Sequence, residues 1–518
     1  MFKPLFCLIA GICFFLTMPE FGLAQSPEQK VDTAALLAGV GDLPHLQPKA
    51  TLLGLKGAQL QRIKLPAAPQ GFRLELLGTD HLPVINVKGE IHPPISDTKV
   101  VLYLQLVQLN NPTFRLDISR SVMVPGLYSK EATADRVPVP APFVIPALKE
   151  WQGQQGIFSL DPNARIVIDP TQKESLAALS EQLHQEIKVQ NDLDLPVRIG
   201  KPGKGDILIR LSQSDTALGL EGYRLHIGEN IELSAPHEPG LFWGTRTLLQ
   251  LLEDTLKLPY GMARDYPSFA VRGLVLDVGR KFFTLDFLKD YVKLLSYYKL
   301  NDFQIHLSDN GFKKYFGDNW DSTYSAFRLE NSTYPGLTAK DGHYTKQEFR
   351  DLQQLGRQYG VNIVPEIDVP AHALAFSKVI PEIGSKKYGL DHLDLHNPKT
   401  DTVVQNVFRE YLAGPNPVFS GQVVDIGTDE YAKADGEAFR GFTDRMIRFV
   451  QGYGKQVRLW GALTWAKGNT PVQVKGVTMN TWYNGYAEPT AMKKLGYNQI
   501  STPDGWLYIV PAAGYYYD

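Results

Sequence analysis

The stretch VVDIGTDEY (423–431) is an apolar run that ends on two adjacent carboxylates, Asp429 and Glu430. Neighbouring side chains of a β-strand point to opposite faces, so both acids could face one site only if the extended geometry ended before them. Gly427 is the kind of residue at which a strand bends or ends. The stretch therefore predicts a buried strand that breaks at Gly427 and turns both carboxylates toward its carboxyl end. In the alternative interpretation, Thr428 caps a helix and the acids are ordinary first-turn residues.

Apolar stretches of the same kind recur around this strand and alternate with amphipathic, helix-like segments. The other predicted strands are RGLVLDVG, DFQIHLS, VNIVPEIDV, QVRLWGA, GVTMNTWY and NQISTPD. Nearly continuous apolar strands that alternate with helices indicate a parallel sheet covered on its outer face. Seven such strands favour an α/β fold, with a (β/α)8 barrel of the TIM type over residues 265–518. The eighth strand is not located, so we expect the last unit to be incomplete.

Two further domains are predicted upstream of the barrel. Residues 151–264 show strand, helix, strand, hairpin and helix in order, which predicts a small α+β domain. Residues 25–146 alternate short apolar stretches with turn residues, a spacing typical of a β-sandwich. Their proline-rich end, DRVPVPAPFVIP (135–146), predicts a linker, and an ordered, extended edge segment is the alternative.

The amino terminus, residues 1–24, has a basic start, an apolar stretch and small residues at Gly22 and Ala24. This pattern predicts a secretory signal, so we expect a secreted or periplasmic protein without a membrane anchor after cleavage. The alternative is an uncleaved anchor, but the apolar run is shorter than the roughly 20 residues that span a bilayer. Both cysteines, Cys7 and Cys13, lie in this segment. The mature chain would then have no disulfide, thiol nucleophile or cysteine-ligated metal.

The overall composition is ordinary for a soluble protein of several domains. Of the 518 residues, 43% are hydrophobic and 21% charged, with 53 basic against 55 acidic side chains. The resulting net charge of -2 gives no reason to expect nucleic acid or a membrane surface as partner.

Polar and aromatic residues collect where the predicted barrel strands end, and this is the end at which barrel enzymes build their active sites. Besides Asp429 and Glu430 they are Arg280, His306, Asp309, Glu366, Asp368, His372, Trp460, Trp465, Trp482 and Tyr483. Carboxylates between aromatic walls suit a carbohydrate site. Ordinary glycosidases separate their two carboxylates, so an adjacent pair fits them poorly. It does fit substrate-assisted hydrolysis, in which a 2-acetamido group attacks its own anomeric carbon.

The barrel region resembles glycoside hydrolase family 20, the β-N-acetylhexosaminidases. The motifs that resemble the family are RGLVLDVGRKFF, DFQIHLSDNGF, PEIDVPAHALAF, LDLHNP and IGTDEY. The preceding α+β unit resembles the accessory domain of that family, most clearly in EGYRLHI and EPGLFWGTRTLLQLL. The resemblance thus covers the accessory and barrel domains.

For catalysis, the resemblance implies four residues. Glu430 would be the general acid, with a raised pKa that keeps it protonated until the glycosidic oxygen leaves. Asp429 would hold the acetamide N–H and stabilise the oxazolinium-like charge. Asp309 and His372 would support the two acids from behind. Their alternative role is that of plain buried polar groups.

For substrate binding, the resemblance implies a second set of residues. Arg280 would bind the 3- and 4-hydroxyls of the sugar, since its planar fork suits this better than a lysine. Trp460 and Trp482 would wall the acetamide pocket. Tyr508 would donate to the acetamide oxygen, and Tyr483 is the competing candidate.

Several positions depart from the family pattern. The signature is often His-x-Gly-Gly-Asp-Glu, whereas Asp425 and Thr428 replace the His and the second Gly. Ala371 replaces a Gly, and Val510 stands where some members place an Asp that contacts the outer hydroxyls of the sugar. The sequence ends at GYYYD, about where the family continues into the last βα unit. We therefore expect an incomplete barrel or its closure by another element.

These features predict a secreted hydrolase that removes terminal β-linked N-acetylglucosamine or N-acetylgalactosamine from glycans, with retention and without a metal or cofactor. One alternative is release of a disaccharide, because PAHALAF, DHLDL and TDEY resemble the lacto-N-biosidase branch of the family. The other is a carbohydrate-binding protein that has kept the fold and lost turnover.

Overall fold

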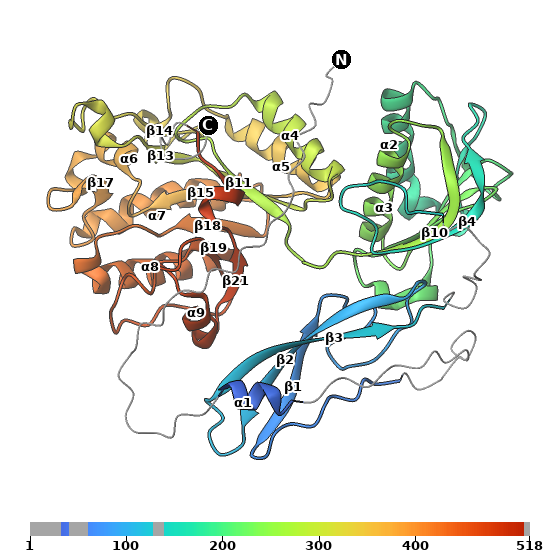
Figure 1. Cartoon of the computed structure of the whole chain (residues 1–518). Helices are drawn as coiled ribbons and strands as arrows, with labels where there is room; N and C mark the ends of the chain where they lie inside the picture. Colours follow the sequence, from blue (N-terminus) through green and yellow to red (C-terminus); the bar gives the residue numbers. More distant parts are fainter. Residues whose placement is uncertain (1–32, 41–60, 128–138, 512–518) are drawn as a thin grey trace.

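The computed structural model describes residues 33–40, 61–127 and 139–511, which form three units (Figure 1). The predicted signal, residues 1–24, lies outside the described residues. Within the described ranges, no helix combines the length and the apolar character needed to cross a bilayer.

The amino-terminal unit contains a single antiparallel sheet with the strand order β1-β2-β3. Its elements are α1 (Thr33–Ala38), β1 (Phe72–Thr79), β2 (Thr98–Gln108) and β3 (Arg115–Val124). Loop residues such as Val84, Ile85 and Ile91 cover the apolar face of this sheet. The predicted β-sandwich is therefore not confirmed in the described part of this unit. Alternating strands show that one face is buried, but they do not show whether a loop or a second sheet covers it.

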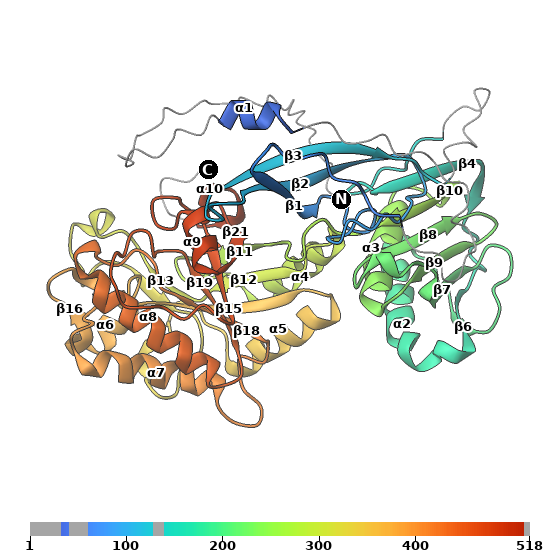
Figure 2. The same ribbon diagram turned by 90° about the horizontal axis from the view of Figure 1, so that it is seen from below.

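The second unit is an α+β domain on a seven-stranded sheet with the order β4-β10-β8-β9-β7-β5-β6 (Figure 2). Its elements are β4 (Glu150–Ser159), β5 (Ile166–Ile168), α2 (Lys173–Asn191), β6 (Val197–Ile199), β7 (Ile207–Leu211), β8 (Tyr223–Ile227), β9 (Ile231–Ala235), α3 (Glu238–Leu251) and β10 (Lys257–Asp265). Residues 139–146 are fixed to this domain, since Trp151 Nε1 donates to Val139 O at 3.1 Å and Ile145 N donates to Gln250 Oε1 at 2.7 Å.

The carboxyl-terminal unit is built on a parallel sheet with the order β21-β20-β19-β18-β15-β12-β11-β22. Its strands are β11 (Gly273–Asp277), β12 (Asp302–His306), β15 (Asn362–Val369), β18 (Val423–Gly427), β19 (Gln456–Trp460), β20 (Val477–Thr481), β21 (Asn498–Ser501) and β22 (Tyr508–Ile509). The helices are α4 (Leu285–Tyr297), α5 (Lys346–Gln358), α6 (Leu374–Val379), α7 (Pro398–Leu412), α8 (Gly436–Gln451), α9 (Pro489–Leu495) and α10 (Asp504–Leu507). All seven predicted strands are present, and β22 is the eighth.

The sheet curls like part of a TIM barrel but does not close. Its edge strands are β21 and β22, and no ladder joins them within the described residues. The sheet is thus open and curled, and the last unit of the predicted (β/α)8 barrel is incomplete, as the sequence led us to expect. The reason is that β22 has only two residues, which pair with β11 at Val275–Tyr508 and Leu276–Ile509. A cavity of about 700 Å³ lies along the open seam.

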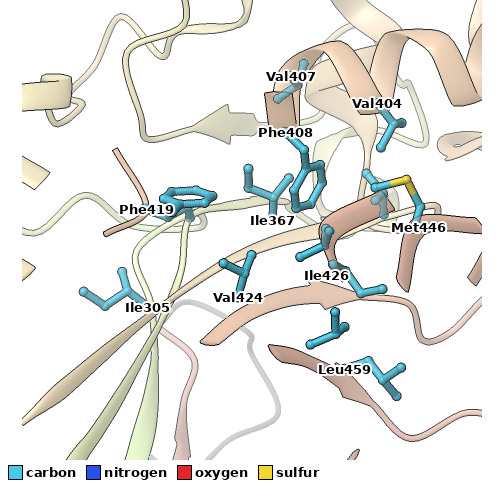
Figure 3. Packing of buried hydrophobic residues seen from close by; sticks show 14 of the residues in the cluster. Ile305, Ile367, Val404, Val407, Phe408, Phe419, Val424, Ile426, Met446 and Leu459 are labelled. Atoms are coloured by element: carbon cyan, nitrogen blue, oxygen red, sulfur yellow. The ribbon is translucent and has the colours of Figure 1, made fainter. Parts of the chain in front are cut away.

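The main hydrophobic core lies between the outer face of this sheet and its helices. Ile367 of β15 and Val424 and Ile426 of β18 are buried together with Phe408 of α7 and Met446 of α8 (Figure 3). Because strand side chains alternate, the residues between these apolar ones face the inside of the curl. There they are charged: Glu366, Asp368 and Asp425.

Candidate active site

A row of charged residues crosses the inner face of the sheet, one from each of five neighbouring strands. Asp277 pairs with His306, His306 with Glu366, Glu366 with Asp425, and Asp425 with Arg458. All five are buried. The parallel register therefore brings together charges that lie far apart in the sequence.

His306 connects two carboxylates in this row. Its Nδ1 lies 2.6 Å from Glu366 Oε1, and its Nε2 lies 2.7 Å from Asp309 Oδ2. Burial alone would lower the pKa of His306, but Glu366 and Asp309 outweigh it and raise the pKa well above its usual value. Asp277, His306 and Asp309 are close enough to hold a cation. The charged imidazole already supplies positive charge at that place.

The strand β18 ends at Gly427, as the sequence predicts. A Cβ at Gly427 would lie 1.8 Å from Asp368 Oδ1, and the residue has a φ of +66°, so both space and conformation require glycine. Thr428 and Glu430 also adopt positive φ, at 65° and 42°. This sharp turn presents Asp429 and Glu430 at the same end of the sheet.

Thr428 does not cap a helix, so the alternative interpretation of the acid pair is wrong. The next helical turn begins at Lys433, and Thr428 Oγ1 has no hydrogen-bond partner among the described residues. Its backbone N–H instead donates to Asp368 Oδ1 at 3.1 Å. Thr428 is a buried, β-branched residue in a left-handed conformation, which is a strained geometry typical of functional sites.

His372 lies between the acid pair and Asp309. Its Nδ1 is 3.0 Å from Asp309 Oδ1, and its Nε2 is 3.1 Å from Glu430 Oε2 and 3.8 Å from Asp429 Oδ1. Burial would lower the pKa of His372, but Asp309 and Asp368 raise it well above its usual value. Of the sequence-predicted supporting pair, His372 is therefore in direct contact with both acids, and Asp309 contacts His372 from behind.

The two acids have opposite electrostatic environments. Burial, followed by the charges of Glu430 and Glu366, raises the pKa of Asp429 to about 7, although His372 opposes this. Burial would also raise the pKa of Glu430, but hydrogen bonds from His372 and Tyr486 lower it below its usual value. The sequence-based expectation of a raised pKa for Glu430 is thus contradicted for the ligand-free site. Here the proton of the pair resides on Asp429.

Arg280 follows β11 and is held by two carboxylates. Its Nη1 lies 2.8 Å from Asp277 Oδ2 and 2.7 Å from Asp309 Oδ2, while its Nε donates to Asn310 O at 3.1 Å. Its Nη2 lies 3.5 Å from His372 Nδ1. The guanidinium is therefore fixed in orientation next to the imidazole that contacts the acid pair.

Three of the predicted aromatic residues form one cluster. Trp460 donates from Nε1 to Glu366 Oε1 at 2.7 Å and stacks on Tyr508, with ring centroids 5.2 Å apart. The ring of Trp482 meets Trp460 edge to face at 6.3 Å. Tyr483 also contacts Trp482, but 57% of its surface is exposed. The structure thus brings Tyr508, rather than Tyr483, against the buried ring of Trp460.

Two family sequence models match this chain. Residues 269–514 match the sequence model of "Glycosyl hydrolase family 20, catalytic domain", and residues 141–266 match "Glycosyl hydrolase family 20, domain 2". The chain belongs to glycoside hydrolase family 20. The two matches together cover the α+β domain and the curled sheet, and they leave the amino-terminal unit without a match to either model.

Curated and solved members of family 20 share a quarter or so of their residues with this chain. Lacto-N-biosidase of Bifidobacterium bifidum is 24% identical over 393 residues, 70% of this chain and 32% of the relative. Beta-N-acetylhexosaminidase of Cellulomonas fimi is 28% identical over 321 residues, 58% of this chain and 62% of the relative. The chain therefore spans less than two thirds of either relative. The structure of Streptomyces plicatus N-acetyl-beta-hexosaminidase has 26% identity and a TM-score of 0.59, over 71% of this chain and 76% of that one.

The family 20 site opens into two adjoining cavities. One, of about 380 Å³, is lined by Arg280, His372 and Glu430 together with Lys313, Trp320, Asp391 and His392. The other, of about 550 Å³, shares Arg280, Gly311 and Phe312 with the first and is lined by the aromatic residues Phe282, Tyr315, Phe316 and Tyr324. The space next to the acid pair therefore continues past Arg280.

Several residues of this family 20 site were not predicted from the sequence to take part in it. Asp277 was not singled out, and His306 and Glu366 were noted only as polar residues near strand ends. Their common position in the sheet register is the signal that could have found them. Tyr486, which lowers the pKa of Glu430, lies in a loop after β20, and no periodic pattern marks it.

Proposed function

We propose that this chain hydrolyses the glycosidic bond of a terminal β-linked N-acetylhexosamine, N-acetylglucosamine or N-acetylgalactosamine, on a glycan. The observation that carries the proposal is the adjacent pair Asp429 and Glu430, with His372 in contact with both. Family membership supports it. The signal pattern at residues 1–24 supports export, so we place the activity outside the cytoplasm.

The adjacent acids suit substrate-assisted catalysis with retention. Asp429 Oδ1 is buried and has no hydrogen-bond partner among the described residues, so it offers a site for the acetamide N–H. The acetamide oxygen then bonds to the anomeric carbon as the bond from that carbon to the leaving oxygen breaks, and Glu430 protonates the leaving oxygen. Water, deprotonated by Glu430, next attacks the anomeric carbon and opens the oxazolinium ring.

Substrate binding also places the proton correctly for this reaction. In the free site, Asp429 has the higher pKa of the pair and holds the proton. An acetamide N–H favours the ionised form of Asp429, since it donates a hydrogen bond to it. The single proton of the pair is then left to Glu430, which is the residue that must donate it.

The remaining residues fit a sugar of this kind. Arg280, fixed by Asp277 and Asp309, is positioned to bind ring hydroxyls. Trp460, Trp482 and Tyr508 supply the apolar surface that an acetamide methyl group needs. These contacts support the roles that the family resemblance implies.

A second candidate is the release of a disaccharide, and the aromatic cavity past Arg280 favours it. A simple exo-acting site ends at the non-reducing sugar, whereas here about 550 Å³ of space with aromatic walls adjoins it. A relative that matches 70% of this chain is named lacto-N-biosidase. A second sugar attached to the N-acetylhexosamine could occupy this cavity.

The test is chromophore release from an aryl β-N-acetylglucosaminide and from an aryl β-lacto-N-bioside. Both assays use the purified chain beside Glu430→Gln. Turnover of the first substrate, lost in the variant, supports the exo-acting hexosaminidase. Turnover of the disaccharide substrate alone supports the second candidate. A folded chain that binds these sugars and hydrolyses neither would contradict both and indicate a carbohydrate-binding protein.

A further inference from the structure

Tyr486 lies beside the acid pair, and the reaction described above assigns no role to it. It follows β20 in the segment 482–486. Its backbone oxygen accepts hydrogen bonds from the N–H groups of Thr464 at 2.8 Å and Trp465 at 3.1 Å. Two loops, those that follow β19 and β20, are thus joined at Tyr486, so its backbone is fixed relative to the sheet.

The ring of Tyr486 is held between two indole rings. Its centroid lies 4.7 Å from that of Trp482, at an interplanar angle of 28°, and 4.9 Å from that of Trp465, at 30°. Trp465 Nε1 donates to the backbone oxygen of Tyr431 at 3.0 Å, one residue after Glu430. Stacked aromatic pairs are favourable beyond their buried area. The stack therefore connects the Tyr486 ring to the backbone next to the acid pair, at Tyr431.

The hydroxyl of Tyr486 lies close enough to the side chain of Glu430 to lower the pKa of that carboxyl group. Glu430 is the less buried member of the pair, with 40% of its side chain exposed against 11% for Asp429. Packing alone therefore does not fix its carboxyl group. His372 contacts Oε2 at 3.1 Å, and Tyr486 supplies a second contact from another loop.

We propose that Tyr486 is a positioning residue for Glu430. Its ring is held between Trp465 and Trp482, and its hydroxyl keeps the carboxyl group of Glu430 in place. This inference rests on the proposed function, in which Glu430 protonates the leaving oxygen. A tyrosine hydroxyl can both donate and accept, so the contact persists when Glu430 changes its protonation state. The rate lost on removal of the Tyr486 hydroxyl should therefore be larger for a leaving group that needs a proton from Glu430 than for one that does not.

The kinetic test compares Tyr486→Phe with the wild type on two aryl β-N-acetylglucosaminides. A 2,4-dinitrophenolate leaves without a proton, whereas 4-methoxyphenol needs one. We expect kcat/KM, which reports the steps up to departure of the leaving group, to fall by about tenfold for the 4-methoxyphenyl substrate, part of the 10²–10⁴ that a general acid supplies. For the dinitrophenyl substrate we expect kcat/KM within about twofold of the wild type. Equal losses on the two substrates, or no loss on either, would overturn the proposal.

A matched control is Tyr497→Phe. Tyr497 is a buried tyrosine whose hydroxyl donates to Val472 O at 3.0 Å, with no hydrogen bond to the acid pair. Its loss removes one buried hydrogen bond from the same domain. Both substrates should therefore react at the wild-type rate in this variant, and the same change of selectivity in Tyr497→Phe would contradict a specific role for Tyr486.

A second measurement does not depend on activity. The pKa of Glu430 can be measured by NMR in protein whose glutamates carry ¹³C at the side-chain carboxyl group. The signal of Glu430 is the one that is missing from the Glu430→Gln variant. Loss of the Tyr486 hydroxyl should raise the Glu430 pKa, because a donor to its carboxylate is removed. An unchanged pKa would overturn the proposal. A wild type that is inactive on every substrate would refute the proposed function. The titration would still show whether the Tyr486 hydroxyl acts on Glu430.

Discussion

Nε2 of His372 lies 3.1 Å from Oε2 of Glu430, and this contact continues a chain of charges into the interior of the sheet. The other ring nitrogen of His372 faces Asp309, which in turn contacts His306 and Arg280. Burial would raise the pKa of Asp309, but Arg280 and His372 hold it well below its usual value. Asp309 is thus ionised and keeps His372 charged next to the acid pair.

Replacement of this imidazole should remove most of the activity. In His372→Gln the acid pair loses its positive neighbour, so the pKa of Asp429 rises further and Asp429 binds the acetamide N–H less well. We expect kcat/KM on aryl β-N-acetylglucosaminide to fall by about 100-fold or more. His396→Gln is the control, because His396 is an exposed histidine that pairs with Asp435 at 2.9 Å. A similar loss in both variants would contradict a specific role for His372.

The pH dependence of kcat/KM should be bell-shaped, because the acid pair must hold one proton. Below the pKa of Glu430, which is lowered from 4.5, both acids are protonated, and Asp429 cannot accept the N–H. Above about pH 7, the pKa of Asp429, both acids are ionised, and Glu430 has no proton to give. The measurement is kcat/KM from about pH 3 to about pH 9. Activity that stays level well above pH 7 would contradict this assignment.

The sequence predicted the parts of this structure that depend on local pattern. All seven strands were found from their apolar runs, and the break at Gly427 followed from the position of one glycine. The eighth strand was not located in this way, since β22 is only two residues long. Likewise, the strands of the amino-terminal unit indicated a buried face without showing that a loop covers it.

The candidate site was predicted less completely than the fold. The acids, Asp309 and His372 were identified through motifs, and the structure brings them together. The pKa of Glu430 was predicted in the wrong direction, because the donors that lower it come from two other loops. Tyr486 is one of these donors, and its position depends on the stack with Trp465 and Trp482, which no local pattern shows.

Gly427 should tolerate no side chain. In Gly427→Ala the new Cβ would lie 1.8 Å from Asp368 Oδ1, and the positive φ adds backbone strain. We expect a loss of about 3 kcal/mol or more in the free energy of unfolding, measured by chemical denaturation, together with a loss of activity. Gly414→Ala is the matched control, since Gly414 also has a positive φ but nothing within 4 Å of its Cβ. Its cost should be about 1–2 kcal/mol. Equal costs would show that the space beside Asp368 is not restrictive.

Asp429→Asn should stabilise the protein more strongly as the pH rises. The pKa of Asp429 is raised from 3.8 to about 7, so the folded chain binds the proton more tightly than the unfolded chain. This favourable contribution is present below about pH 4 and is lost as the pH rises toward 7, because the unfolded chain then gains by releasing a proton that the folded chain still holds. Asparagine does not ionise. Relative to the wild type, the variant should therefore gain about 2–4 kcal/mol between pH 4 and pH 7.

The measurement is the thermal midpoint of Asp429→Asn minus that of the wild type, taken at several pH values. Glu437→Gln is the control, because hydrogen bonds from Thr470 and the backbone N–H of Asn469 lower the pKa of Glu437 to about 2. Glu437 is thus ionised in both the folded and the unfolded chain at pH 5–7, so its replacement should change the midpoint equally across that range. If the difference in thermal midpoint between Asp429→Asn and the wild type also stays constant with pH, then Asp429 is already ionised in the free site. The acetamide N–H would then bind without moving a proton to Glu430.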